Sequence, residues 1–149
     1  MEVDMVRFFA LPALLAASIA VASPVMAATM RLEGHFQPEH ATTSHPEGTV
    51  RATLDTHSNL VKYTLTWTGL SGPVVAAHFH GPASASEEAG VLVPIPAPYK
   101  SGQHGSVLLS SEQAQALQNG QVYVNLHTAA LPNGEARAQL APVTPGGAK

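Results

Sequence analysis

The stretch TVRATLDTHSNLVKYTLTWT, residues 49–68, decides the fold class. Polar and apolar residues alternate through 49–55 and again through 60–68, which is the pattern of strands that bury one face. The four residues between them, THSN, are polar and include turn formers. The stretch therefore predicts an antiparallel β-hairpin.

Glycine and proline divide the chain around this hairpin into further short segments. Ser110 with Gln113 three residues later has the form of a capping box, which predicts a short helix over 112–119. Residues 39–48 are polar and are expected to form a loop. Prolines crowd the segment 91–95, which favours the edge of a sheet. The other expected strands cover residues 30–36, 74–80, 105–109, 121–127 and 135–140. This pattern predicts an all-β fold, a Greek-key β-sandwich or barrel with one short helix.

The first 27 residues are expected to be a signal peptide. An apolar run over 8–22 follows Arg7 and leads to Val25-Met26-Ala27, where small residues precede the expected cleavage. The run is about 15 residues long, shorter than the roughly 20 that span a bilayer, and Pro12 interrupts it. A membrane anchor is therefore disfavoured. We expect an exported protein, periplasmic or secreted, with no membrane attachment after cleavage.

The remainder is expected to be one domain over residues 28–141, followed by a flexible Pro/Gly-rich tail over 142–149. The chain has no cysteine, which excludes disulfides and thiolate metal sites, so a core or a bound ion must stabilise it. Its formal net charge of −3 and the absence of a basic tract argue against a nucleic-acid partner. No Gly-x-Ser-x-Gly turn, HExxH helix or glycine-rich phosphate loop indicates a hydrolase or nucleotide site.

The pair His78 and His80 is the strongest candidate for chemistry. Two residues apart on a strand, their side chains project from the same side about 6.6 Å apart, so both imidazoles can reach one ion. Phe79 points to the opposite side. His127 ends another expected strand and would complete a three-imidazole group if the two strands were neighbours. Such ligands suit copper, zinc, nickel or iron, and three nitrogens with an open position suit Cu(II) or catalytic Zn(II).

Other interpretations of the histidines remain open at this stage. The His78–His80 pair could instead be hydrogen-bonded strand residues without a metal. A fourth ligand is expected from His104, which follows the flexible residues 101–103, or from His35 near the end of the first strand. Glu87 and Glu88 lie on the loop after the pair and either face the site or form a solvated acidic surface.

Three segments together resemble the CHRD domain, named for chordin and found in many bacterial secreted proteins. They are AHFHGPA (77–83), YVNLHT (123–128) and PNGEAR (132–137). The resemblance extends from about Arg31 to Leu140 and implies a Greek-key β fold. It implies little about function, because bacterial members are mostly uncharacterised and the animal domain occurs in an extracellular growth-factor antagonist.

The order of residues is also similar to that of copper-zinc superoxide dismutase, another Greek-key barrel. A His-x-His strand is followed by a strand ending in His and then by Gly-x-x-Arg. This similarity implies copper ligation by His78, His80 and His127, with Arg137 beside an open copper face. The zinc loop of that enzyme has no clear counterpart between Gly81 and His104, and its disulfide is absent. The similarity therefore implies one copper ion rather than two metals.

Arg137 and Asn125 each have a simpler interpretation. Arg137 could attract a small anion such as superoxide, or it could form an exposed pair with Glu135. Asn125 could simply hydrogen-bond a neighbouring loop. Three functions follow as hypotheses: a copper-binding protein that dismutates superoxide, a non-catalytic copper or zinc buffer, or an extracellular adhesion module without metal.

Overall fold

The computed structural model describes residues 28–143 and confirms the all-β class. The expected signal peptide, residues 1–27, lies outside the described residues. The elements in chain order are β1 (Thr29–His35), β2 (Gln37–Pro38), β3 (Glu47–Asp55), β4 (Leu60–Thr68), β5 (Val74–His80), β6 (Val91–Pro94), β7 (Gln103–Leu108), α1 (Ser111–Gln118), β8 (Val122–Thr128) and β9 (Ala136–Pro142).

The expected hairpin is formed by β3 and β4, which pair antiparallel from Glu47↔Thr68 to Leu54↔Val61. Asp55 begins the turn, because its carboxylate accepts hydrogen bonds from the N–H groups of His57 and Ser58 at 2.9 and 3.1 Å. Asn59 ends the turn with a positive φ of 59°, a conformation that asparagine tolerates better than most residues. Local turn chemistry therefore sets the register of this hairpin.

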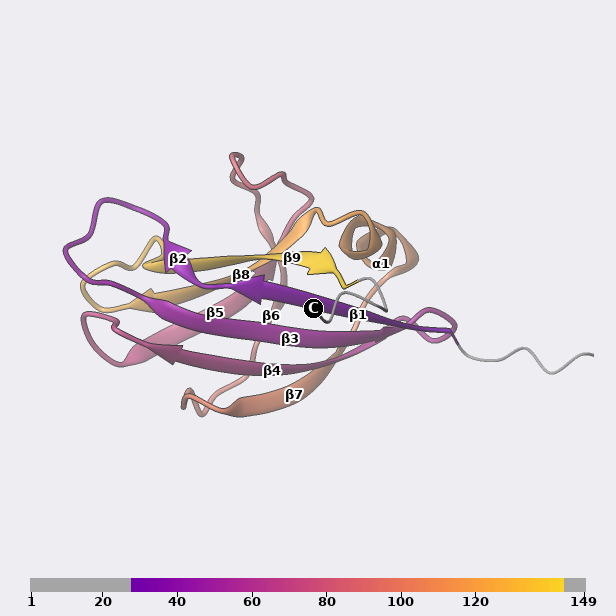
Figure 1. The fold of residues 1–149 in the computed structure, drawn as a ribbon, viewed down its shortest axis with the longest axis horizontal. Coiled ribbons are helices and arrows are strands. Elements are labelled where there is room, and N and C mark those ends of the chain that lie inside the picture. Colours follow the sequence, from indigo (N-terminus) through magenta and orange to yellow (C-terminus); the bar gives the residue numbers. More distant parts are fainter. Residues whose placement is uncertain (1–27, 144–149) are drawn as a thin grey trace, which may run out of the picture.

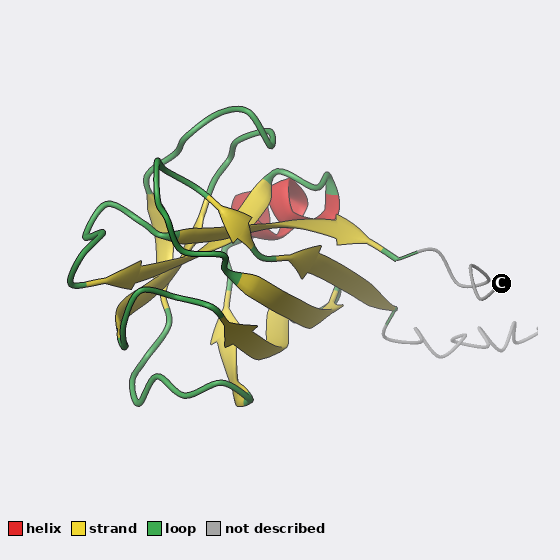
Figure 2. Ribbon diagram, turned by 60° about the vertical axis from the view of Figure 1, so that its left-hand side comes forward, coloured by secondary structure: helices red, strands yellow, loops and turns green. Residues whose placement is uncertain are grey.

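The strands form a nearly closed barrel in the order β6-β5-β8-β9-β1-β3-β4-β7 (Figures 1 and 2). Two halves, β6-β5-β8-β9 and β1-β3-β4-β7, are joined where β1 pairs with β9 at Leu32↔Pro142 and Glu33↔Ala141. The chain leaves β6, crosses to β7 in the other half, and returns through α1 to place β8 beside β5. That return is a Greek-key connection. The proline-rich β6 lies at the end of the strand order, as predicted.

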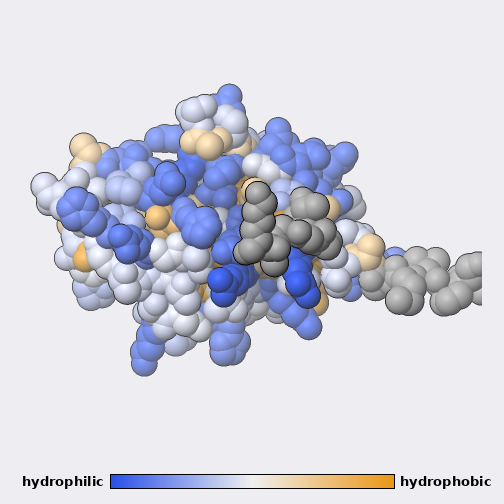
Figure 3. Space-filling view, in the orientation of Figure 1, coloured by the Kyte–Doolittle hydropathy of each residue, from blue (hydrophilic) through white to orange (hydrophobic). Residues whose placement is uncertain are grey.

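The core fills the space between the two halves with the inward side chains of alternating strand positions. Tyr63 of β4 and Phe79 of β5 meet there edge to face, with ring centroids 5.4 Å apart. The helix α1 adds the buried side chains Ala114 and Leu117. Its expected capping box is present, since Ser110 and Gln113 each hydrogen-bond the other's backbone N–H. The outward positions are mostly polar, and the surface in Figure 3 is largely hydrophilic.

A few boundaries differ from the sequence-based expectation. β9 continues through Pro142, and the N–H of Val143 donates to Arg31 O at 2.8 Å, so the expected tail does not begin at 142. Residues 144–149 lie outside the described part. The two-residue strand β2, which pairs with β9, was not predicted because it is too short to show a period. Within residues 28–143, no helix is both long and apolar enough to cross a membrane.

Candidate metal site

The pairing of β5 with β8 brings the three histidines of the prediction together. The register places Ala76 opposite His127, His78 opposite Asn125, and His80 opposite Tyr123. Because side chains alternate along each strand, the two histidines of β5 share the outward side with His127. The intervening residues point into the core, where Phe79 is 2 % exposed. β5 and β8 are therefore neighbours, as the predicted three-imidazole group required.

The imidazoles of His78, His80 and His127 form a compact group, called the triad below. One nitrogen from each ring can be chosen so that all three lie within 4.8 Å of one another. The closest pair is His78 Nδ1 and His127 Nε2, 3.0 Å apart. No aspartate, glutamate or other histidine of residues 28–143 joins the group. The triad is thus an all-nitrogen donor set.

Backbone carbonyls orient two rings of the triad through hydrogen bonds at Nδ1, on the side of each ring opposite Nε2. His80 Nδ1 lies 3.0 Å from Ala89 O, and His127 Nδ1 lies 2.9 Å from Pro132 O. A carbonyl can only accept, so each Nδ1 carries the proton and each Nε2 keeps its lone pair. His80 Nε2 is buried and has no hydrogen-bond partner in the protein. A buried nitrogen lone pair without a partner, on a ring held from behind, is the arrangement expected of a metal ligand.

The surroundings favour the neutral form of His78 and His80. Burial, followed by the proximity of His127 and His80, lowers the pKa of His78 below 6.5. The pKa of His80 is also lowered, mainly by burial and then by His127 and Arg137, against the opposing effect of its hydrogen bond to Ala89. Neutral imidazole is the form that binds metals, so these rings present lone pairs at neutral pH.

The triad lies within two of the three segments that carried the family resemblance, and Pro132 begins the third. The model of the CHRD domain family matches residues 28–140. The chain belongs to the CHRD family. Comparisons with curated proteins and with solved structures found no match. The CHRD domain thus covers the whole barrel from β1 to Leu140 in β9.

Arg137 of the CHRD domain lies near the triad but behind Tyr123. The guanidinium carbon is 3.5 Å from the centre of the Tyr123 ring. His80 stacks on the same ring with centroids 5.0 Å apart and planes 9° from parallel. Since β5 and β9 flank β8 on opposite sides, the tyrosine ring separates Arg137 from His80. The guanidinium is also engaged by Ser84 O and Glu87 O, at 2.8 and 2.6 Å. The structure thus places Arg137 beside the triad, on the other side of the Tyr123 ring from His80.

Glu135 does not form the exposed pair with Arg137 that was one interpretation of the sequence. Its side chain is fully buried. The carboxylate accepts hydrogen bonds from the hydroxyls of Ser44, Ser71 and Thr128 at 2.5, 2.7 and 2.5 Å. It also accepts one from the N–H of Ser71 at 2.6 Å. Burial alone would raise the pKa of Glu135, but these hydrogen bonds lower it to about 2. The carboxylate is therefore charged and joins three loops.

Glu39 is a residue beside the site that the sequence did not indicate. The amide of Asn125 donates to its carboxylate, which confirms that Asn125 hydrogen-bonds a neighbouring loop. The other carboxylate oxygen lies 4.0 Å from Arg137 Nη1. Burial raises the pKa of Glu39, although His40 and Arg137 act in the opposite direction. The residue lies in the irregular loop after β2, where no periodic pattern could have revealed its burial.

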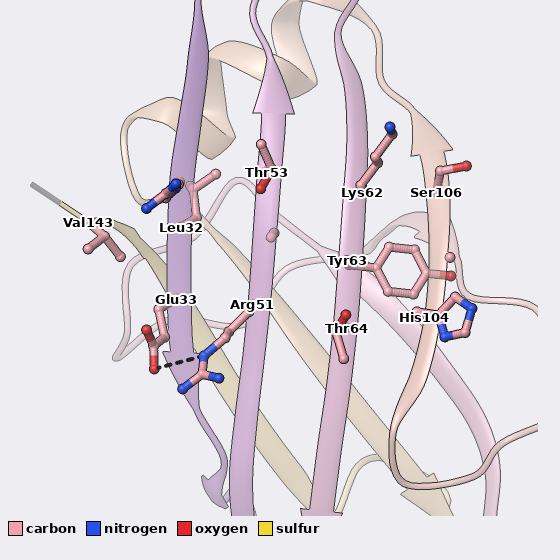
Figure 4. Close-up of a pocket in the computed structure, with 13 residues that line it drawn as sticks. Leu32, Glu33, Arg51, Thr53, Lys62, Tyr63, Thr64, His104, Ser106 and Val143 are labelled. Atoms are coloured by element: carbon pink, nitrogen blue, oxygen red, sulfur yellow. Dashed lines mark ion pairs between the residues drawn. The ribbon is translucent and has the colours of Figure 1, made fainter. Parts of the chain in front are cut away.

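The two residues expected to supply a fourth ligand lie elsewhere. His104 sits on β7 opposite Thr64, among outward side chains of the other half of the barrel (Figure 4). His35 ends β1, where its side chain is 70 % exposed and lies 3.8 Å from Glu33. The structure does not bring either to the triad, because β7 and β1 belong to the half-sheet that does not contain β5 and β8. Glu87, which was also a candidate to face the site, has its carboxylate engaged elsewhere and accepts a hydrogen bond from the N–H of Ser84.

Proposed function

We propose that this CHRD domain binds a single copper ion through His78, His80 and His127, with zinc as a weaker alternative. The observation that carries the proposal is the buried Nε2 of His80, which has no partner while its Nδ1 is already bonded to Ala89. A hydrogen-bond donor would be expected beside this atom in a purely structural cluster. A metal ion facing the three rings would satisfy it.

Copper is favoured by the chemistry of the donors. The triad contains imidazole nitrogen only, without thiolate or carboxylate. Imidazole suits copper and zinc, and affinity for divalent ions in a given site is greatest for Cu(II). Export to the periplasm or beyond, which the N-terminal segment suggests, would place the site outside the compartment where thiol proteins compete for copper.

Superoxide dismutation is a finer part of the proposal. Three protein ligands leave a coordination position for a small molecule, and His78 is only half-buried, so solvent can reach this side of the group. A bound copper ion would supply the one-electron redox chemistry that conversion of superoxide to oxygen and hydrogen peroxide requires. Arg137 would contribute its positive charge from behind Tyr123 and not by contact with the anion. A copper buffer would use the same ligands without turnover.

The binding proposal is tested by titrating the exported protein with Cu(II) against a competing chelator and recording its electron paramagnetic resonance spectrum. We expect one ion per chain and hyperfine coupling to nitrogen. His78→Ala, His80→Ala and His127→Ala should each lower the affinity by more than the roughly 10–100-fold that loss of an outer-shell partner costs. His57→Ala, in the exposed β3–β4 turn, is the matched control. Unchanged affinity in His78→Ala and His80→Ala would contradict the proposal.

A superoxide assay on the copper-loaded protein separates enzyme from buffer. Activity above that of the same concentration of free copper, lost in His127→Ala, is expected of an enzyme. Tight copper binding with activity no higher than free copper would leave the buffer function and exclude dismutation.

A further inference from the structure

The orientation of the triad depends on two backbone carbonyls that lie in loops and not in strands. Ala89 O holds His80, and Ala89 precedes β6 in the loop that follows β5. Pro132 O holds His127 from the loop between β8 and β9. Loops are ordinarily more mobile than the strands they connect. Each carbonyl therefore needs an anchor if it is to hold a ring in one orientation.

Arg137 is the anchor of the loop that carries Ala89. Its guanidinium donates to Ser84 O and Glu87 O, two carbonyls of that loop. The same guanidinium packs on the Tyr123 ring, and the Tyr123 hydroxyl accepts a hydrogen bond from Ala89 N at 3.2 Å. The Arg137 side chain is 12 % exposed, so solvent competes little for these bonds. A chain of contacts thus runs from Arg137 through Ala89 to the His80 ring.

Glu135 is the anchor of the loop that carries Pro132. Its carboxylate accepts from the Thr128 hydroxyl, and the same hydroxyl oxygen accepts from Leu131 N at 3.3 Å. The backbone N–H of Glu135 donates to Leu126 O at 2.8 Å, which closes the base of the loop. This second chain of contacts runs from Glu135 through Thr128 and the loop to the His127 ring.

We propose that Glu135 and Arg137 are positioning residues of the triad, each acting through a different carbonyl on a different ring. Arg137 sets His80 through Ala89 O, and Glu135 sets His127 through Pro132 O. The two residues flank Ala136, whose side chain is fully buried in the core, so one short segment of the chain governs both rings. The metal-binding consequence rests on the proposed function, whereas the effect on the rings does not.

The proposed effect is on the position of a proton as well as on the angle of a ring. While the carbonyl is in place, it holds the proton on Nδ1 and leaves the Nε2 lone pair directed into the triad. When the loop is released, the proton can move to Nε2 and block the metal-facing atom. Loss of either anchor should therefore change one ring and leave the other as it was.

Nitrogen NMR of the metal-free protein tests this directly, because it distinguishes the two imidazole tautomers. Arg137→Met, which keeps an apolar chain over Tyr123, should mix the tautomers of His80 and leave His127 unchanged. Arg137→Lys should show less mixing of the His80 tautomers than Arg137→Met. Glu135→Gln should affect His127, and His78 through its hydrogen bond to His127, but should leave His80 unchanged. If that variant does not fold, Thr128→Val breaks the same link with the carboxylate retained. Ser44→Ala, which removes a Glu135 contact remote from Pro132, is the matched control.

Copper affinity provides the second measurement. Arg137→Met should lower the affinity about 10–100-fold in the wild-type background and in His127→Ala, but not in His80→Ala. Thr128→Val should lower the affinity in the wild-type background and in His80→Ala, but not in His127→Ala. Arg51→Met, on the outward face of β3, controls for loss of one positive charge. The proposal would be overturned if a variant lost equal copper affinity in the His127→Ala and His80→Ala backgrounds. It would also be overturned if the imidazole tautomers were unchanged in every variant. If wild-type protein binds no copper, the NMR result still decides it, and only the proposed function fails.

Discussion

His78 Nδ1 and His127 Nε2 lie 3.0 Å apart across the neighbouring strands β5 and β8. Because Pro132 O keeps the His127 proton on Nδ1, His127 Nε2 must be the acceptor and His78 Nδ1–H the donor. The hydrogen bond therefore joins two rings of the proposed metal site, and an ion bound through these two nitrogens would displace its proton.

Metal binding is expected to move this proton. On addition of Zn(II), which is diamagnetic, nitrogen NMR should show His78 changing from the Nδ1–H to the Nε2–H tautomer while His80 and His127 keep their protons on Nδ1. The physical reason is that His78 Nδ1 cannot donate to His127 and bind an ion at once. A His78 resonance that stays unchanged at saturating zinc would contradict this.

Copper affinity should depend weakly on pH until acid conditions. The pKa values of His78 and His80 are both lowered below 6.5, mainly by burial. Protons therefore compete with copper for His78 and His80 only at pH below 6.5, and affinity should fall as the pH decreases further. The free energy of unfolding should also fall as the pH decreases. The unfolded chain binds protons near pH 6.5, whereas His78 in the folded chain binds them only at lower pH, so acid favours unfolding. Chelator competition at a series of pH values measures the onset, and an onset above 6.5 would count against the lowered pKa values of His78 and His80.

Glu135 should make the fold sensitive to strong acid. Its pKa is lowered from 4.5 to about 2, so its contribution to stability is present above pH 4.5 and is lost as the pH falls toward 2. Glu135→Gln should lower the free energy of unfolding at neutral pH by about 2–4 kcal/mol, since buried hydroxyl donors lose a charged acceptor. Denaturant titrations between these pH values should show a flatter profile for the variant. Glu33→Gln, on the surface of β1, is a suitable control.

Phe79 and its histidine neighbours should have separable effects. Phe79→Leu removes core packing against Tyr63 and should lower the free energy of unfolding by about 1–2 kcal/mol, with the copper stoichiometry unchanged. His78→Ala, on the outward side, should do the reverse and abolish tight binding with little effect on stability. Urea unfolding and copper titration of the two variants measure this. Loss of copper binding in Phe79→Leu at full folding would argue against the strict division of faces.

His104→Ala and His35→Ala should each leave copper affinity within about twofold of wild type, because neither residue lies at the triad. The same chelator competition measures this. A tenfold loss in either variant would show that the residue reaches the ion in the bound state and would restore it as the fourth ligand.

Local rules were sufficient for many elements. The strands Leu60–Thr68 and Val74–His80 were predicted at their observed bounds, and the Ser110–Gln113 capping box begins α1 as expected. These features depend on alternation, turn residues and capping, all of which act between residues close in the chain. The common outward direction of His78 and His80 follows from the same alternation.

The sequence by itself determined every strand except the two-residue β2, the class of the fold and the shared face of the His78–His80 pair. Only the tertiary structure decided that His127 joins them, that His104 does not, and that Glu135 is buried. These outcomes depend on which distant strands pair and in which register, as with Ala76 and His127. Pairing of that kind is selected by burial of the whole core and by closure of the barrel, which no local pattern contains.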